Sequence, residues 1–246
     1  MLSLPLLNEF ELTGRSRSHL IEAIELHCTL HREVMPAFLA LREAALADGI
    51  DLRAASSFRD FDRQLMIWNG KFRGERVLTD REGRALDATS LTPIERIEAI
   101  LAWSALPGAS RHHWGTDFDV YDAAAMSDVA ALQLIPQEYA AQGPFAKLTQ
   151  WLDTHMHHFG FFRPYVTHGD GVSAEPWHLS FAPLAVRCLE QLSPQLLSKI
   201  LLVVPLEGRA EVLARIDDIH RRFIAAITQP AASLVDFELG DHRRVV

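Results

Sequence analysis

The chain has 246 residues, of which 23% are charged and 48% hydrophobic, so its composition is globular and excludes disordered and fibrous classes. Its formal net charge of −8 speaks against nucleic-acid binding, because neutralising a phosphate backbone needs clustered basic side chains. The two cysteines, Cys28 and Cys188, form no CxxC pair, which excludes a disulfide framework and a cysteine-rich zinc site.

The N-terminal segment has neither the basic stretch nor the unbroken apolar core of a secretory signal, since Pro5 interrupts its apolar run. No stretch reaches the ~18 consecutive apolar residues that a membrane span requires. We therefore expect a cytoplasmic protein without a membrane span. A periplasmic location is the alternative if the sequence is a shortened form of a longer chain.

Apolar side chains recur at helical spacing in the first half of the chain, where we expect these helices: residues 18–47 divided in two at Pro36, 61–72 after the N-cap Asp60, and 93–104. Between them, residues 50–58 predict a strand. Residues 73–92 are polar and contain glycine, so they predict a loop.

Polar and apolar side chains alternate over residues 116–121, which is typical of a strand with Asp117 and Asp119 on one face. The remaining expected elements are a helix over 145–158, strands after Gly160 and over 177–181, and helices over 196–204 and 210–227. The tail after Thr228 is expected to be loose.

Helices and short strands are mixed without a regular βαβ rhythm, which indicates an α+β fold with a small antiparallel sheet and flanking helices. Residues 1–190 are expected to form the domain that carries the chemistry. Residues 191–246 are expected to be a C-terminal helical extension packed on it. The sequence leaves the oligomeric state open.

Two short segments combine histidines with carboxylates at fixed offsets. His112 precedes the predicted strand and Asp119 lies within it seven residues later, while Gly115 allows a tight turn between them. His178 lies on another predicted strand. Two imidazoles and a carboxylate on adjacent strands would form a zinc site with a fourth position open, as catalytic zinc sites have.

Glu175 precedes His178 by three residues, and Pro176 interrupts the strand so that the Glu175 carboxylate can lie beside the metal. A carboxylate that does not bind the metal is the usual general base in such hydrolases. Trp177, on the alternate face, is expected to be a core residue.

These residues carry a resemblance to a known family. The pattern Ser110-x-His112-x-x-Gly115-x-x-x-Asp119, followed by Glu175-x-Trp177-His178, resembles the zinc signature of VanY-type D-alanyl-D-alanine carboxypeptidases. These are zinc peptidases of bacterial peptidoglycan, and their fold is shared with the hedgehog signalling domain. The segment Ser56-Ser57-Phe58-Arg59, followed by Gln64, is similar to a second element of the family. The resemblance covers about residues 33–183.

The resemblance implies three zinc ligands: His112, Asp119 and His178. It also implies that Glu175 is the catalytic base and that Arg59, helped by Gln64 and Ser110, binds the terminal carboxylate of the substrate. An arginine can hold a carboxylate through two parallel hydrogen bonds. The helix N-terminus that is expected directly after Arg59 would also favour an anion.

Asp117 departs from the family pattern, which has a small residue at this position. Because it shares a face with Asp119, it is either an alternative ligand or an acceptor for a ligand. His113 is not expected to bind the metal, and Tyr165 is a candidate for steadying an oxyanion. Three further histidines are expected to be structural or to support ligands: His157, His158 and His168.

The implied activity is hydrolysis that releases the terminal D-Ala from peptidoglycan stem peptides (muropeptides). An L,D-carboxypeptidase acting on tetrapeptides is favoured, because a cytoplasmic D,D-enzyme would destroy the cell's own pentapeptide precursors. The alternatives are a D,D-carboxypeptidase on pentapeptides, a dipeptidase or endopeptidase, and a non-catalytic, zinc-stabilised binding module. Glu175 and Arg59 speak against the module, since a structural metal needs neither. Another divalent metal in the same ligands also stays open.

Overall fold

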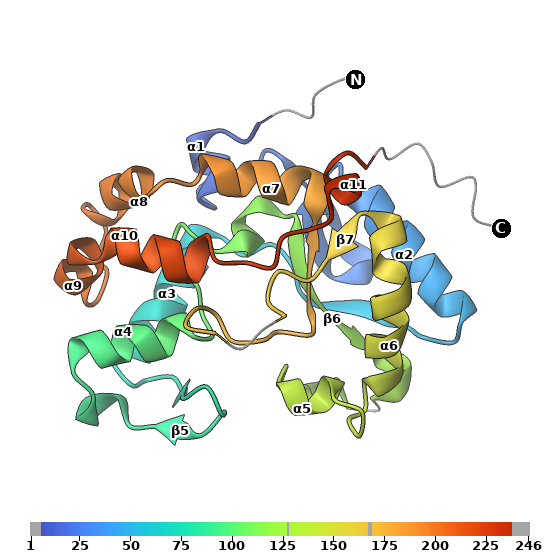
Figure 1. Ribbon diagram of the computed structural model, residues 1–246, viewed down its shortest axis with the longest axis horizontal. Coiled ribbons are helices and arrows are strands. Elements are labelled where there is room, and N and C mark those ends of the chain that lie inside the picture. The colour runs from blue at the N-terminus through green and yellow to red at the C-terminus, as the bar shows by residue number, and fades with distance from the viewer. Residues whose placement is uncertain (1–5, 127, 167–168, 238–246) are drawn as a thin grey trace.

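The computed structural model describes residues 6–126, 128–166 and 169–237 (Figure 1). The α+β prediction is confirmed, because an antiparallel four-stranded sheet lies among helices. In spatial order its strands are β3 (Leu52–Ser56), β6 (Asp117–Asp122), β8 (His178–Phe181) and β7 (Phe161–Phe162). Within the described residues, no helix combines the length and the apolar character that crossing a bilayer requires.

Strand β6 lies at the centre of the sheet and determines the position of the chemistry. Asp119 is opposite Ser56 of β3 on one side and opposite His178 of β8 on the other. The alternation expected from the sequence is confirmed, since Phe118 and Val120 belong to the apolar core while Asp119 has polar neighbours. The register therefore sets the Asp119 carboxylate directly beside the His178 imidazole.

One hydrophobic core joins the sheet to helices α2 (Met35–Ala47) and α6 (Ala146–His155). The Phe118 ring from β6 packs edge-on against Phe38 of α2 and against Phe161 of β7, with ring centroids 5.0 and 5.3 Å apart. Edge-on packing of this kind stabilises a core beyond the burial of its area. This core packs against the face of β6 that carries Phe118 and Val120.

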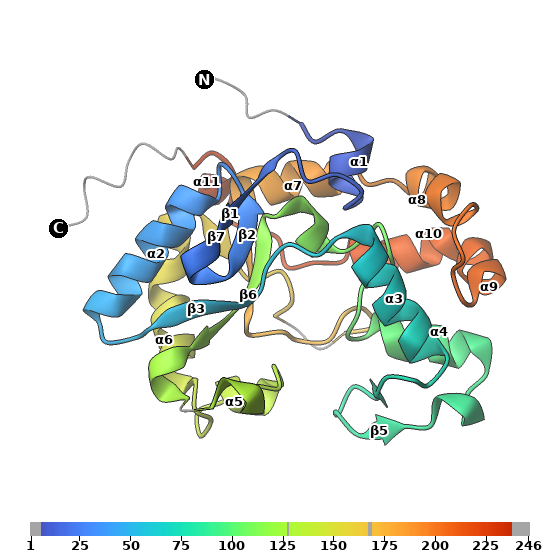
Figure 2. The same cartoon turned by 180° about the vertical axis from the view of Figure 1, so that it is seen from behind.

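A second core lies at the opposite end of the molecule, where the C-terminal helices stand beside α3 and α4 (Figures 1 and 2). Its helices are α3 (Phe61–Phe72), α4 (Pro93–Leu101), α7 (Ala182–Gln191), α8 (Pro194–Leu201), α9 (Arg209–Ala214) and α10 (Ile216–Ile219). Trp68 of α3 is fully buried there, and its indole N–H donates to the carbonyl of Glu207 at 3.0 Å. The C-terminal helices thus share one core with α3 and α4.

The helix starts expected at Asp60 and Thr92 are confirmed. The Asp60 carboxylate accepts from the backbone N–H of Arg63 at 2.7 Å, and Thr92 forms a capping box with Glu95. Such caps satisfy backbone donors that the first helical turn leaves free.

The segment before α2 was expected to be helical, and this prediction was wrong. It forms an antiparallel hairpin of β1 (Leu20–Ala23) and β2 (Cys28–His31), joined by the 3₁₀ turn η1 (Ile24–Leu26). The backbone N–H of His31 donates to the carbonyl of Gly115 at 2.9 Å, and Phe58 donates to Thr29 at 3.0 Å. Hydrogen bonds to distant segments therefore stabilise this segment as strands, and a local periodicity cannot reveal such partners.

Three further expectations need correction. The helix expected over 210–227 is broken at Arg215 into α9, α10 and the π turn η7 (His220–Ile224). The expected loop 73–92 contains the paired strands β4 (Leu78–Thr79) and β5 (Ala85–Leu86). The tail expected to be loose contains α11 (Ala232–Val235), whose Leu234 is buried in a small core, and residues 238–246 lie outside the described part. The other short helices are α1 (Glu9–Leu12) and α5 (Pro136–Tyr139).

Gly115 ends the 3₁₀ turn η3 (Arg111–Trp114) with a positive φ of 67°, so that the chain can enter β6. A Cβ at this position would lie 2.7 Å from the backbone nitrogen of His31 and would also meet the Leu20 side chain. We expect Gly115→Ala to lower the free energy of unfolding by about 2–4 kcal/mol, as measured by urea denaturation. The reason is that the His31 backbone cannot move to make room for the added methyl group.

The matched control is Gly83→Ala, which has a φ of 82° but nothing within 4 Å of the added Cβ. It isolates the cost of the left-handed backbone, about 1 kcal/mol. Equal losses in the two variants would show that the close approach of β2 to Gly115 has no energetic effect.

Candidate metal centre

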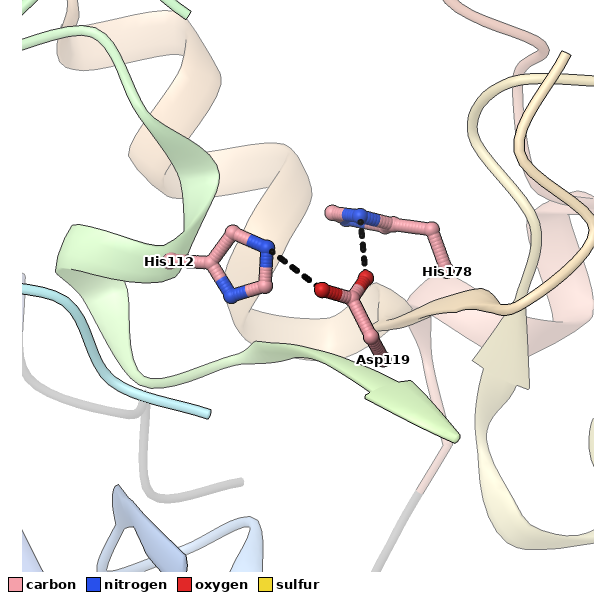
Figure 3. Close-up of side chains that lie close together, drawn as sticks. All are labelled: His112, Asp119 and His178. Carbon is pink, nitrogen blue, oxygen red and sulfur yellow. Dashed lines mark ion pairs between the residues drawn. The ribbon is translucent and has the colours of Figure 1, made fainter. Parts of the chain in front are cut away.

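The three predicted ligands meet at one point, from three elements (Figure 3). His112 comes from η3, Asp119 from β6 and His178 from β8, and all three side chains are buried. Nε2 of His112 lies 3.5 Å from Oδ2 of Asp119, and Nδ1 of His178 lies 3.2 Å from Oδ1 of the same carboxylate. The predicted metal triad is therefore confirmed as a structural cluster.

The donor atoms fit a bound cation. Oδ1 of Asp119 and Nδ1 of His178 are buried and lie 3.2 Å apart, but neither makes a well-aligned hydrogen bond with any residue that the structure describes. A buried polar atom without a partner costs about 1–3 kcal/mol, and a cation between these atoms would remove that cost. Two imidazole nitrogens and one carboxylate oxygen form the donor set of a catalytic zinc site with one position left open.

Hydrogen bonds at the far side of each imidazole set which nitrogen faces the centre. Nδ1 of His112 lies 2.9 Å from the carbonyl of Ser57, so it donates there and leaves the Nε2 lone pair for a metal. His178 is reversed, because its Nε2 lies 3.0 Å from Oδ1 of Asp117 and its Nδ1 faces the centre. Such outer partners fix the tautomer and the ring orientation of metal ligands.

Asp117 thus serves as an acceptor for a ligand and is not part of the metal triad among the described residues. Its Oδ1 also accepts from Nε of Arg111 at 2.7 Å. Burial acts to raise the pKa of the Asp117 carboxyl, but Arg111 and His178 outweigh it and hold this pKa well below its usual range. The carboxylate is therefore ionised and can orient the His178 ring.

Replacing Asp117 by asparagine is expected to weaken zinc binding about 10- to 100-fold, because the amide loses the charge that holds His178 in place. The measurement is competition for zinc with a chelator of known affinity. Because the single variant leaves Arg111 buried without its counter-charge, the double variant Arg111→Met/Asp117→Asn is measured beside it. Zinc affinity within about twofold of the parent in both folded variants would contradict this role of Asp117.

Glu175 lies beside the triad, in the segment that leads into β8. Its Oε2 is 3.3 Å from Nδ1 of His178, and its backbone N–H donates to the carbonyl of Tyr165 at 3.0 Å. Burial raises the pKa of the Glu175 carboxyl above its ordinary value. A carboxylate so placed, close to a metal centre but outside the ligand set, is suited to accept and return a proton.

Arg59 is held with its guanidinium in a fixed orientation. Nη1 donates to Oε1 of Gln64 at 2.9 Å and Nη2 donates to Oγ of Ser56 at 3.3 Å, while the Gln64 amide donates to the carbonyl of Ala105 at 2.6 Å. Burial lowers the pKa of Arg59, although Asp119 and Glu175 oppose this. Gln64 acts by holding Arg59, which keeps further N–H donors available for a ligand.

The metal triad opens into a cavity of about 910 Å³, which Glu175, Arg59 and Ser110 also line. Its walls come from the β4–β5 hairpin on one side and from the segment that leads into α5 on the other (Figure 1). A cavity of this size accepts a ligand larger than a single amino acid. The sequence did not indicate either wall, because the first was expected to be a plain loop.

The remaining candidate residues fall into three groups. His113 is structural, since its Nδ1 lies 2.6 Å from the carbonyl of Arg59, and burial lowers its pKa to about 3. The Tyr165 ring lies edge-on to His178 at 5.1 Å and lines the cavity. His157 and His158 belong to η6 (Met156–Phe159) and are absent from the described lining, while His168 lies outside the described residues.

Comparisons with known proteins agree with this site. The family model described as VanY, D-alanyl-D-alanine carboxypeptidase, matches residues 27–184. A D-alanyl-D-alanine carboxypeptidase of Enterococcus faecalis is 28% identical over 151 residues, which are 60% of this chain and 46% of that protein. An uncharacterised protein of Haemophilus influenzae is 47% identical over 98 residues, which are 39% of this chain and 67% of that protein.

Among solved structures, VanYB in complex with D-alanine-D-alanine is similar to the chain with a TM-score of 0.50. The two are 23% identical, and the match covers 75% of this chain and 88% of VanYB. At this identity the likeness concerns the fold, which agrees with the α+β architecture.

Proposed function

Because the chain belongs to the VanY family of D-alanyl-D-alanine carboxypeptidases, we propose that it is a zinc L,D-carboxypeptidase that releases the terminal D-Ala from tetrapeptide stems of peptidoglycan. We propose a cytoplasmic location with it. In that compartment a D,D-enzyme would consume pentapeptide precursors, whereas an L,D-enzyme would trim recycled tetrapeptides to tripeptides.

The observation that carries the proposal is the placing of Glu175 beside the His112–Asp119–His178 triad, in the same cavity as Arg59. A structural metal site would need no free carboxylate and no arginine beside it. A carboxypeptidase needs a base next to the metal and a cation for the terminal carboxylate of its substrate.

The residues then act as follows. A zinc ion in the triad would polarise the scissile carbonyl and acidify the attacking water. Arg59, held by Gln64, binds the terminal carboxylate, and Ser110 supports it. Glu175 accepts a proton from the water while the oxygen of that water bonds to the carbonyl carbon. It then passes that proton to the nitrogen of D-Ala as the C–N bond breaks, which leaves a tripeptide carboxylate and free D-Ala.

The test measures D-Ala release by the zinc-loaded protein on tetrapeptide and pentapeptide muropeptides in parallel. We expect release from the tetrapeptide and its loss in Glu175→Gln. Release from the pentapeptide alone would replace the proposal by a D,D-carboxypeptidase. Release from neither, with zinc still bound, would shift the function to an endopeptidase or to a zinc-stabilised binding module.

A further inference from the structure

The cavity is basic although the protein is acidic. Five basic side chains and three carboxylates line it, whereas the whole chain has a formal net charge of −8. Charges that line a concave site with low-dielectric walls focus the field and concentrate ligands of the opposite sign. The contrast indicates that the cavity receives an anion.

Three of the basic side chains that line the cavity come from one short stretch of the chain, residues 71–81, and we call them the basic wall: Lys71, Arg76 and Arg81. Lys71 comes from the last turn of α3, and Arg81 follows β4 in the β4–β5 hairpin. The Arg76 side chain packs over Gly70, directly next to Lys71 in the chain, because a Cβ on Gly70 would lie 3.1 Å from Cδ of Arg76. The turn that directly follows α3 therefore brings Arg76 back against this helix, where its backbone N–H donates to the carbonyl of Gly70 at 3.1 Å.

The basic wall has N–H donors that are available to bind an anion. Within the described residues, Nζ of Lys71 has no hydrogen bond or ion pair, although the side chain is half-buried. Burial and the nearby Arg59 lower the pKa of Lys71 to about 8. Nη2 of Arg81 is held by the carbonyl of Gly171 at 2.7 Å, while its Nη1 is buried without a partner among the described residues.

The carboxylates of the cavity have other partners. Glu82 pairs with Arg84 at 3.0 Å, and Asp119 and Glu175 face His178 at the metal centre. The other two basic side chains are also committed, since Arg111 pairs with Asp117 and Arg59 is assigned to the terminal carboxylate. The basic wall is therefore available for an additional negative charge.

We propose that the basic wall binds a second carboxylate of the substrate, in addition to the terminal one, and so selects acidic stem peptides. The inference rests on the proposed function. In a stem tetrapeptide such a carboxylate has two sources: the side chain of a diaminopimelate-type third residue, and the α-carboxylate of a γ-linked glutamate. Amidation of either group removes its charge with little change in size.

The experiment compares three synthetic tetrapeptides: one with both groups free, one amidated on the third residue, and one amidated on the glutamate. For the protein with zinc bound, we expect kcat/KM to fall about 10- to 100-fold on amidation of the group that the basic wall binds. The variants Lys71→Met and Arg81→Met should lose a similar factor on the free peptide. They should discriminate much less between free and amidated peptides, as coupled groups do in a double-mutant cycle.

The matched control is Arg73→Met, because Arg73 directly follows α3, is exposed, and pairs with Glu75 and Glu207, none of which belongs to the described lining. It should keep the full discrimination. Wild-type activity that is insensitive to both amidations, or variants that keep the discrimination, would overturn the inference while the proposed function stands. Absence of D-Ala release from every peptide would instead reject the proposed function.

Discussion

Glu175→Gln is expected to lower D-Ala release by about 10²–10⁴-fold, because the amide cannot accept the proton that the water loses. The substitution keeps size and shape, and Glu175 is not one of the three clustered ligands. The amide oxygen can still face Nδ1 of His178, which lies 3.3 Å from the carboxylate. The variant should therefore bind zinc nearly as well as the parent does.

Two measurements on the same sample check this: zinc content after dialysis, and the rate of D-Ala release. Glu190→Gln, on the exposed side of α7, makes the same chemical change away from the cavity and should be fully active. If Glu175→Gln retained more than about a tenth of the parental rate, another group would have to serve as the base.

Asp119→Ala is expected to abolish zinc binding at micromolar zinc and to reduce hydrolysis by at least about 10³-fold. Asp119 lies between the two imidazoles and supplies the single carboxylate of the triad, so only His112 and His178 would remain. Two imidazoles do not form the three-ligand set of a catalytic zinc site.

The readout that does not depend on activity is the thermal midpoint with and without zinc. In the parent protein, zinc at about 100 times its dissociation constant should stabilise the native state by about 2.7 kcal/mol and raise the midpoint. Asp119→Ala should show no such rise, whereas Asp62→Ala, an exposed change in the first turn of α3, should show the parental one. A parental rise in Asp119→Ala would mean that the metal binds elsewhere.

The residues of the metal centre could be identified from the sequence because their spacing reflects local geometry. Gly115 turns the chain between His112 and Asp119, and strand alternation directs Asp119 to the polar face. The helix starts at Asp60 and Thr92 were also predictable, since a cap is a contact within four residues. Such signals depend on neighbouring positions in the chain.

The sequence by itself therefore predicted the α+β class and the three residues of the metal triad, and it suggested Glu175 as the base and Arg59 as the arginine that binds the terminal carboxylate. The tertiary structure alone decided that residues 20–31 form a hairpin, that Asp117 supports His178 and does not join the triad, and that Lys71 and Arg81 line the same cavity as the metal triad. Each of these depends on contacts between segments far apart in the chain. Their free energy comes from burial and pairing with distant partners, and no local periodicity records those partners.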